Sequence, residues 1–365
     1  MLYLHIPFCR SKCHYCAFYS RPASDSLMHT FAQALTVEIQ LRHSEITHPI
    51  RTLYLGGGTP SILPLSLINQ ILTSLHRHFD LSRLEEATLE ANPEHLSPSY
   101  LASLRSLGFN RLSLGIQRGS DADLQLLGRR HTVGQSLAAI DAALAAGFSN
   151  LSLDFIYGLP SPPDFLHFPL QAISHVSAYA LTLEPRTALE LHVKQGRLAL
   201  PTDDEVARQY HQVRQWLASQ GFIQYEVSNF SLPGKQSIHN SRYWNRTPYL
   251  GLGPSAHSFN GSCRSWNLAS TARYIAALTS PSPTLPIEGH EILTPADDFN
   301  ELLMTSLRTT RGLPLASVPA SRLATLIKQA QPYINCGWLQ STPSHLQPTG
   351  EGLLHADGIA ASLFV

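Results

Sequence analysis

Short apolar runs alternate with longer amphipathic segments from the start of the chain to about Ser219. Six runs have the length and composition of β-strands: Leu2–Ile6, Thr52–Leu55, Ala87–Glu90, Arg111–Gly115, Leu151–Ile156 and Ala178–Leu183. The segments between and after them predict helices at Ser26–His43, Leu65–His78, Ser97–Leu107, Gly134–Ala146, Phe168–His175 and Asp203–Ser219. Such alternation indicates βα units on a parallel sheet. We therefore predict an α/β fold, a partial TIM-like (β/α)6 barrel.

Polar or glycine-rich groups follow the predicted strands at one end. In barrels of this kind, chemistry gathers at the carboxyl ends of the strands. After the first strand comes a cysteine-rich loop, and after the second comes Gly56–Pro60; the later strands are followed or ended by Glu90, Asn92, Gln117, Asp154 and Glu184. Each of these is, taken alone, an ordinary turn residue. Together they predict an active site at this end of the barrel.

The alternation of strand-like and helix-like segments ends near Pro281. Residues Pro281–Pro286 read as a linker or surface loop. Beyond them the pattern predicts two helices and two short strands: Asp297–Leu307, Pro319–Gln331, Gly337–Leu339 and Leu353–Leu354. We expect a barrel core with an extension over residues 1–280 and a small helix-rich domain over residues 281–365.

Composition narrows the classes of function. The chain has 365 residues, 43% of them hydrophobic, and 26 basic residues balance 26 acidic ones. A net charge of zero does not favour a protein that coats nucleic-acid phosphates, so we expect no nucleic-acid partner. The sequence shows neither a signal-peptide pattern nor a long apolar run. We expect a cytoplasmic protein, and peripheral attachment to the inner membrane stays open.

Three cysteines near the start form the strongest chemical signal. Cys9, Cys13 and Cys16 have the spacing C-x3-C-x2-C. Three thiolates can hold three irons of a [4Fe–4S] cube and leave the fourth iron open to a small molecule. The alternatives are a zinc site completed by His5 or His14 and three buried thiols. Zinc sites more often use separated cysteine pairs, and no second pair follows, so we favour the cluster.

Two further segments carry candidate binding groups. The run Gly56–Gly58 lets backbone approach a ligand closely, and Arg129 has the fork geometry that pairs with a carboxylate. In a later segment, His239 precedes Tyr243 and Trp244. Imidazole binds iron, including haem iron, and the two aromatic rings suit a flat macrocycle. The alternative is a hydrogen-bonded loop histidine beside two core aromatics.

Taken together, the motifs resemble the radical S-adenosylmethionine (SAM) superfamily and, within it, the anaerobic coproporphyrinogen III oxidase family. The blocks that carry the resemblance are Leu2–Cys9, Gly56–Ser61, Glu90–Glu94, Ser113–Gln117 and Asp154–Pro160. The resemblance implies that Cys9, Cys13 and Cys16 ligate a [4Fe–4S] cluster, whose open iron SAM chelates and whose electron cleaves SAM to a 5′-deoxyadenosyl radical. It also implies cofactor contacts from Tyr3, Tyr15, Gly57, Gly58, Thr59, Glu90, Gln117, Arg129, Asp154 and Ala180.

One departure points to a subfamily. The oxidases continue their motif as C-x3-C-x2-C-x-C, whereas this chain has Phe18 at the last position. This difference, together with His239–Trp244, resembles the HemW type, which binds haem and delivers it to haemoproteins such as membrane respiratory enzymes. The resemblance implies a haem chaperone with haem near His239, and it leaves a homodimer open. The alternative is an oxygen-independent coproporphyrinogen III oxidase, an enzyme activity that Phe18 disfavours.

Overall fold

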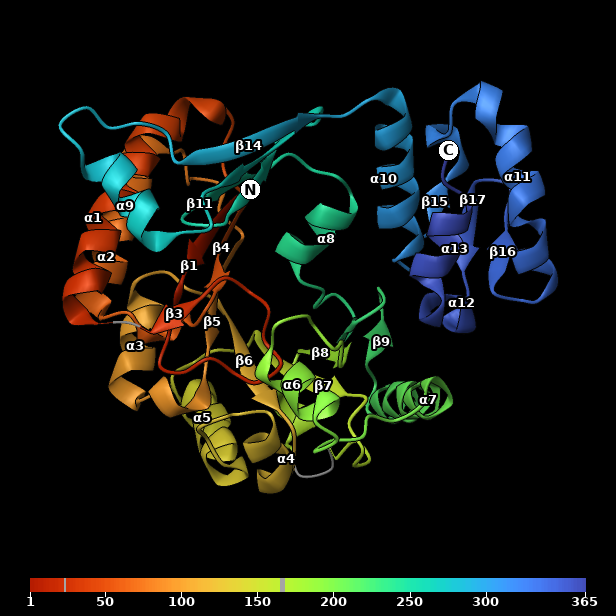
Figure 1. The fold of residues 1–365 in the computed structure, drawn as a ribbon, viewed down its shortest axis with the longest axis horizontal. Helices are drawn as coiled ribbons and strands as arrows, with labels where there is room; N and C mark the ends of the chain where they lie inside the picture. The colour runs from red at the N-terminus through yellow and green to blue at the C-terminus, as the bar shows by residue number, and fades with distance from the viewer. Residues whose placement is uncertain (23, 165–167) are drawn as a thin grey trace.

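The computed structural model describes residues 1–22, 24–164 and 168–365. A nine-stranded sheet dominates it, with the strand order β11-β1-β4-β5-β6-β7-β8-β10-β9 (Figure 1). The six central strands are parallel: β1 (Leu2–Ile6), β4 (Thr52–Gly57), β5 (Glu86–Ala91), β6 (Arg111–Gln117), β7 (Leu151–Tyr157) and β8 (His175–Ala180). β11 (Leu250–Leu252) adds a parallel edge, and β10 (Asn229–Ser231) and β9 (Ile223–Gln224) add antiparallel strands at the other edge. The predicted partial barrel is confirmed.

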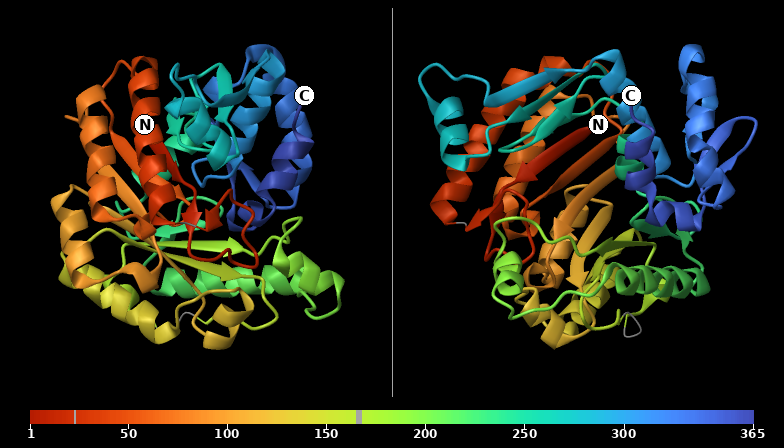
Figure 2. Two further views of the ribbon diagram at one scale, coloured as in Figure 1. Left: turned by 60° about the vertical axis from the view of Figure 1, so that its left-hand side comes forward. Right: turned by 45° about the vertical axis from the view of Figure 1, so that its right-hand side comes forward.

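Helices cover the outer face of this curved sheet (Figure 2). They are α1 (Asp25–Arg42), α2 (Leu65–His78), α3 (Pro98–Ser106), α4 (Asp121–Leu126), α5 (Val133–Ala145) and α7 (Asp203–Ser219). A further helix, α6 (Ala188–Lys194), lies beside the cysteine loop, where the Leu189 N–H donates to the His14 carbonyl. Thr132 and Thr202 begin α5 and α7 with capping boxes, which satisfy the first free N–H groups of each helix. One large apolar cluster fills the space between sheet and helices, so the strand ends are held in fixed positions.

Local pattern gave the wrong element in two places. The predicted helix Phe168–His175 is instead a single 3-10 turn at Leu170–Ala172, followed directly by β8. β8 pairs with β7 along its whole length, from His175 to Ala180, so the chain is already extended where the predicted helix would end. The strand predicted at Ala178–Leu183 therefore begins and ends three residues too late, because β8 spans His175–Ala180. The predicted strand Leu353–Leu354 lies in a helix, α12 (Gly350–Leu354), which Thr349 caps.

A short helix, α8 (Ile238–Trp244), closes the amino-terminal end of the barrel. The Glu86 carboxylate, at the start of β5, accepts the backbone N–H groups of Ile238 and His239, each at 2.9 Å. It also accepts the Ser237 hydroxyl at 3.3 Å. The first turn of α8 is therefore tied to the sheet by one buried carboxylate.

An antiparallel sheet follows, formed by β12 (His257–Phe259), β13 (Cys263–Asn267) and β14 (Ile287–Ile292), with α9 (Thr271–Thr279) packed on α1. The chain then continues through α10 (Pro295–Leu307), β15 (Leu313–Pro314), α11 (Ala320–Asn335), β16 (Leu339–Ser341), β17 (His345–Pro348), α12 and α13 (Ala356–Ser362). These elements enclose a separate apolar cluster around Phe299, Leu303 and Leu326. β14 lies beyond residue 280 yet pairs with β13, and the predicted division at that residue stays a prediction. No helix among the described residues is long and apolar enough to cross a bilayer.

Candidate functional site

The carboxyl ends of the parallel strands surround a cavity of about 540 Å³. We call it the main cavity. All the site residues predicted from the sequence line it except Tyr3 and His239: Cys9, Cys13, Tyr15, Cys16, Gly57, Gly58, Thr59, Glu90, Gln117, Arg129, Asp154 and Ala180. Residues from six different strands or the loops after them thus meet in one place, as the barrel geometry requires. Their individual roles toward a cofactor stay predictions.

The cysteine loop is pinned at both ends. β2 (Phe8–Cys9) pairs with β3 (Arg21–Pro22), which closes the loop on itself. Two donors point at sulfur: Arg129 Nη1 lies 3.3 Å from Cys13 Sγ, and Thr59 Oγ1 lies 3.5 Å from Cys9 Sγ. Burial raises the pKa of the Cys9 thiol. The metal-free thiol therefore holds its proton and releases it when iron binds.

The surroundings of the thiols fit a cluster better than a zinc ion. His5 Nε2 donates to the Tyr19 carbonyl at 2.8 Å, and Nδ1 accepts the Tyr3 hydroxyl at 3.1 Å, so His5 has no nitrogen left for a metal. In the part of the chain that the structure describes, no three His, Cys, Asp or Glu side chains converge closely enough for a single ion. Cys9, Cys13 and Cys16 instead stand around the main cavity. This arrangement suits the separate irons of a [4Fe–4S] cube, which supplies an electron to SAM when bound.

The glycine run brings backbone against the cysteine loop. Gly57 has φ +108°, and a Cβ added there would lie 2.6 Å from the His5 ring. A Cβ on Gly58 would lie 2.6 Å from the Phe8 carbonyl oxygen. Both positions therefore require glycine. Tyr3 supports this contact indirectly. Its hydroxyl bonds to the His5 ring, and the backbone of Gly57 packs against the same ring.

Two carboxylates form one wall of the main cavity. Glu90 accepts the Tyr54 hydroxyl at 2.8 Å and the Gly57 N–H at 3.1 Å, and burial raises its pKa to about 7. Asp154 accepts the Ser113 hydroxyl at 3.0 Å, and burial raises its pKa as well. Carboxylates held in this way are acceptors for hydroxyl groups of a ligand, such as those of a ribose.

Gln117, which has a strained backbone, and the buried Arg129 guanidinium also line the main cavity. Gln117 has φ +70° and sits at a bulge, where β6 shifts register against β7. Such bulges re-aim a side chain next to a site. Arg129 Nη2 donates to Asn92 Oδ1 and to the Gly115 carbonyl, both at 2.7 Å. Its buried Nε–H has no partner among the described residues, which leaves a donor suited to a ligand carboxylate.

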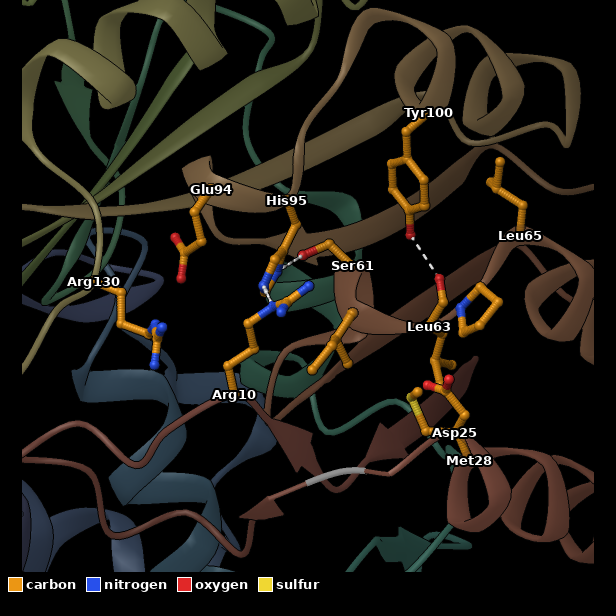
Figure 3. A pocket seen from close by; sticks show the side chains of 12 residues that line it. Arg10, Asp25, Met28, Ser61, Leu63, Leu65, Glu94, His95, Tyr100 and Arg130 are labelled. Atoms are coloured by element: carbon orange, nitrogen blue, oxygen red, sulfur yellow. Dashed lines mark hydrogen bonds between the residues drawn. The ribbon is translucent and has the colours of Figure 1, made fainter.

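A second cavity of about 610 Å³ lies behind the glycine and cysteine loops (Figure 3). Sequence reasoning did not single it out. Arg10 Nε donates to His95 Nε2 at 3.1 Å, so His95 Nδ1 carries its proton and donates to Ser61 Oγ at 3.1 Å. Ser61 Oγ also accepts the Asn92 N–H at 3.2 Å. Because Asn92 holds Arg129, this polar chain links the second cavity to the main one.

His239 lies away from both cavities. It is fully buried beneath the start of β4, where Nδ1 bonds Thr52 Oγ1 at 2.9 Å and Nε2 bonds the Tyr243 hydroxyl at 3.1 Å. Its ring packs on Tyr54, with centroids 5.0 Å apart. Burial lowers its pKa to about 3, so the imidazole is neutral. Its predicted association with haem stays a prediction, and it requires the ring to leave both hydrogen bonds.

The geometry of His239 predicts a loss of stability on substitution. We expect His239→Ala to lower the free energy of unfolding by about 2–4 kcal/mol, because a cavity forms and two buried hydroxyls lose a partner. The predicted association of His239 with haem requires a lower haem affinity in addition. Urea unfolding measures the first quantity and haemin titration the second, with exposed His76→Ala as the control. Weaker haem binding at unchanged stability would favour the haem role instead.

The raised pKa of Glu90 predicts a pH dependence. The group titrates at about 7 when folded against its usual 4.5. Its contribution to stability is therefore fully present below about pH 4.5 and is lost as the pH rises through 7. Relative to Glu90→Gln, the free energy of unfolding of the wild type should fall by up to about 2 kcal/mol over this pH window. Partial exposure of the carboxylate to water limits the size of the loss. Denaturant unfolding of both proteins at pH 5 and pH 8 measures the difference, and parallel pH profiles would contradict the prediction.

Comparison with known proteins agrees with the motifs. The Radical SAM superfamily model matches residues 3–165, and the HemN C-terminal domain model matches residues 293–355. The solved structure of coproporphyrinogen III oxidase (HemN) from Escherichia coli covers 100% of this chain and 89% of its own, with a TM-score of 0.85 and 23% identity. That likeness shows the shared fold. Membership of the superfamily implies a [4Fe–4S] cluster and SAM as cofactors.

Closer sequence relatives decide the family. Heme chaperone HemW of Mycobacterium tuberculosis is 37% identical over 99% of this chain and 94% of its own length. Heme chaperone HemW of Lactococcus lactis is 35% identical over 85% of this chain and 82% of its own length. The resemblance drawn from the cysteine loop and Phe18 is confirmed. The chain belongs to the HemW family of radical SAM proteins.

Proposed function

We propose that this protein binds haem and transfers it to haemoproteins, while it carries a [4Fe–4S] cluster and SAM. The observation that carries the proposal is the near full-length similarity to heme chaperones named HemW. On this proposal the acceptors include membrane respiratory enzymes, which the protein reaches from the cytoplasm. A homodimer is a further part of the proposal.

The mouth of the main cavity supports cargo binding. Phe18, which takes the place of the fourth cysteine of the oxidases, is 71% exposed and lines the cavity. Tyr179, which lines the same cavity, is 44% exposed. Two exposed aromatic rings that line one cavity offer apolar surface on which a flat macrocycle packs well.

The residues of the main cavity have separate tasks in this proposal. Cys9, Cys13 and Cys16 hold the cluster, and the Arg129 and Thr59 donors stabilise the thiolate charge on two of them. Glu90 and Asp154 accept hydrogen bonds from the hydroxyls of SAM, and Arg129 Nε–H, which donates to no described group, donates to the carboxylate of SAM. Together these groups hold the ligand in one orientation and keep water from it.

The alternative function is oxygen-independent coproporphyrinogen III oxidation. The complete cofactor wall favours it, because every predicted SAM-contacting residue except Tyr3 lines the main cavity. That reaction would convert two propionate side chains to vinyl groups, each giving up a hydrogen atom, carbon dioxide and one electron that passes to an electron acceptor, and SAM would supply the radical chemistry when bound. The replacement of the fourth cysteine by Phe18 argues against it.

One reconstituted sample, kept anaerobic, tests the two functions together. Haemin titration, followed by the Soret band, is expected to show one saturable site per chain. Incubation with coproporphyrinogen III, SAM and a reductant is expected to yield no protoporphyrinogen. Authentic HemN serves as the positive control for the assay. Formation of product at HemN-like rates, or absence of haemin binding, would overturn the proposal.

A further inference from the structure

Asn92 lies among the residues that line the main cavity, directly after β5 and at the start of the 3-10 turn Pro93–His95. An asparagine that begins a helical turn commonly caps it, with its side-chain oxygen accepting a backbone N–H of the turn. In the described part of the chain, the Asn92 side chain makes no capping bond of this kind. The local backbone therefore does not explain where this amide points.

The amide of Asn92 instead joins two side chains that donate to sulfur. Arg129 Nη2 donates to Asn92 Oδ1 at 2.7 Å, and Asn92 Nδ2 donates to Thr59 Oγ1 at 3.4 Å. Each partner then reaches a cysteine. Arg129 Nη1 lies 3.3 Å from Cys13 Sγ, and Thr59 Oγ1 lies 3.5 Å from Cys9 Sγ. One amide thus connects the donors of two of the three cysteines.

The direction of every hydrogen bond in this chain is fixed. A guanidinium group only donates, so the oxygen of the Asn92 amide faces Arg129 and its NH2 group faces Thr59. The Thr59 hydroxyl therefore accepts from Asn92, and its single proton is left for Cys9 Sγ. Asn92 in this way directs the Thr59 proton toward one sulfur, and it anchors the guanidinium beside the other.

Asn92 is itself held from both sides. Its backbone N–H donates to Ser61 Oγ at 3.2 Å, and His95 Nδ1 donates to the same oxygen at 3.1 Å (Figure 3). On the other side Gly115 leaves the room that the amide needs, since a Cβ there would lie 3.2 Å from Asn92 Oδ1 and 3.1 Å from Arg129 Nη2. The amide is therefore confined to the position from which it reaches both partners.

We propose that Asn92 is a positioning residue that raises the reduction potential of the [4Fe–4S] cluster bound by the cysteine triplet. Hydrogen bonds to the ligating sulfurs favour the more negative, reduced form of a cluster, so they raise its potential. Asn92 acts on the sulfurs through Thr59 and Arg129. A higher potential lets a milder one-electron donor reduce the cluster. The inference rests on the cluster of the proposed function and not on the binding of haem.

The test is a cycle of four full-length proteins with reconstituted clusters, studied without SAM: wild type, Asn92→Asp, Thr59→Val and the double variant. An aspartate keeps the size of Asn92 but only accepts, so it takes the Thr59 proton away from Cys9 and pairs with Arg129. Titration with titanium(III) citrate, followed by electron paramagnetic resonance of the reduced cluster, gives each potential. Iron analysis verifies cluster loading. Asn335→Asp, exposed at the end of α11, adds the same charge elsewhere.

We expect Asn92→Asp and Thr59→Val each to lower the potential, and Asn335→Asp to match wild type. In the Thr59→Val background the shift caused by Asn92→Asp should be smaller, because no Thr59 proton is left to redirect. A wild-type potential in Asn92→Asp would overturn the inference. A shift of equal size in both backgrounds would overturn it as well, since the carboxylate would then act without Thr59.

Asn92→Leu repeats the test without an added charge and serves if Asn92→Asp loads no cluster. Leucine removes both side-chain bonds, so the potential should again fall below that of wild type. A wild-type potential in this variant would overturn the inference and leave the proposed function intact. Failure of the wild type itself to take up a cluster would overturn both the inference and the cluster of the proposed function, whereas haem binding is measured separately.

Discussion

Replacement of Cys13 by alanine is expected to abolish the iron–sulfur cluster. Reconstituted wild type should contain about four iron atoms per chain, and the variant close to none. The reason is geometric, because Cys9, Cys13 and Cys16 line the main cavity together and Cys13 also receives the Arg129 hydrogen bond. SAM binding should fall with the cluster, since the open iron is lost. Iron analysis, the visible absorption band and SAM titration measure these effects.

The chain supplies its own controls for this experiment. Cys263 and Cys336 are free cysteines that do not line the main cavity. Cys263→Ala and Cys336→Ala should therefore keep full iron content and SAM affinity. Retention of about four irons by Cys13→Ala, or loss of iron from either control, would show that the triplet is not the ligand set.

Gly58→Ala is expected to weaken SAM binding by about tenfold or more, and to lower the free energy of unfolding by about 1–3 kcal/mol. The added Cβ would lie 2.6 Å from the Phe8 carbonyl oxygen and 2.9 Å from the Ile6 carbonyl oxygen. Backbone cannot move out of the way as a side chain does, so the loop must shift. The hydrogen bonds from Gly58 N–H to Ile6 and from Thr59 N–H to Phe8 would then be strained. Thr59, which points at Cys9, would move with them.

A substitution at a glycine outside the site serves as a control that separates a loss of stability from a loss of SAM binding. Gly147 has φ +86°, and a Cβ there would meet nothing within 4 Å. Gly147→Ala should therefore cost about 1–2 kcal/mol of unfolding free energy through backbone strain alone, with SAM affinity unchanged. Calorimetric titration with SAM, beside urea unfolding of both variants, makes the comparison. Equal losses of affinity would mean that Gly58 acts only through global stability.

Much of the barrel was predictable because its elements are long and locally consistent. β1, α2 and α7 begin and end where the sequence pattern placed them. The helix predicted over residues 168–175 does not form: the segment holds one 3-10 turn, Leu170–Ala172, and its last residue, His175, already pairs with β7 as the start of β8. Leu353–Leu354 failed for another reason, since two apolar residues fit a short helix as well as a strand and only the Thr349 cap distinguishes them.

The candidate site also combines features that the sequence determines with features that only the tertiary structure determines. The spacing of Cys9, Cys13 and Cys16, and the place of Phe18 after them, are properties of the sequence, because a cluster motif depends on residues close together in the chain. The sequence alone therefore determined the superfamily and the strand ends at which its chemistry gathers. Burial and pairing across the chain were decided only by the tertiary structure. Folding brings Asn92 between Thr59 and Arg129, and brings Thr52 and Tyr243 to both nitrogens of His239. Whether an imidazole is available to a metal depends on those distant partners, which no local pattern encodes.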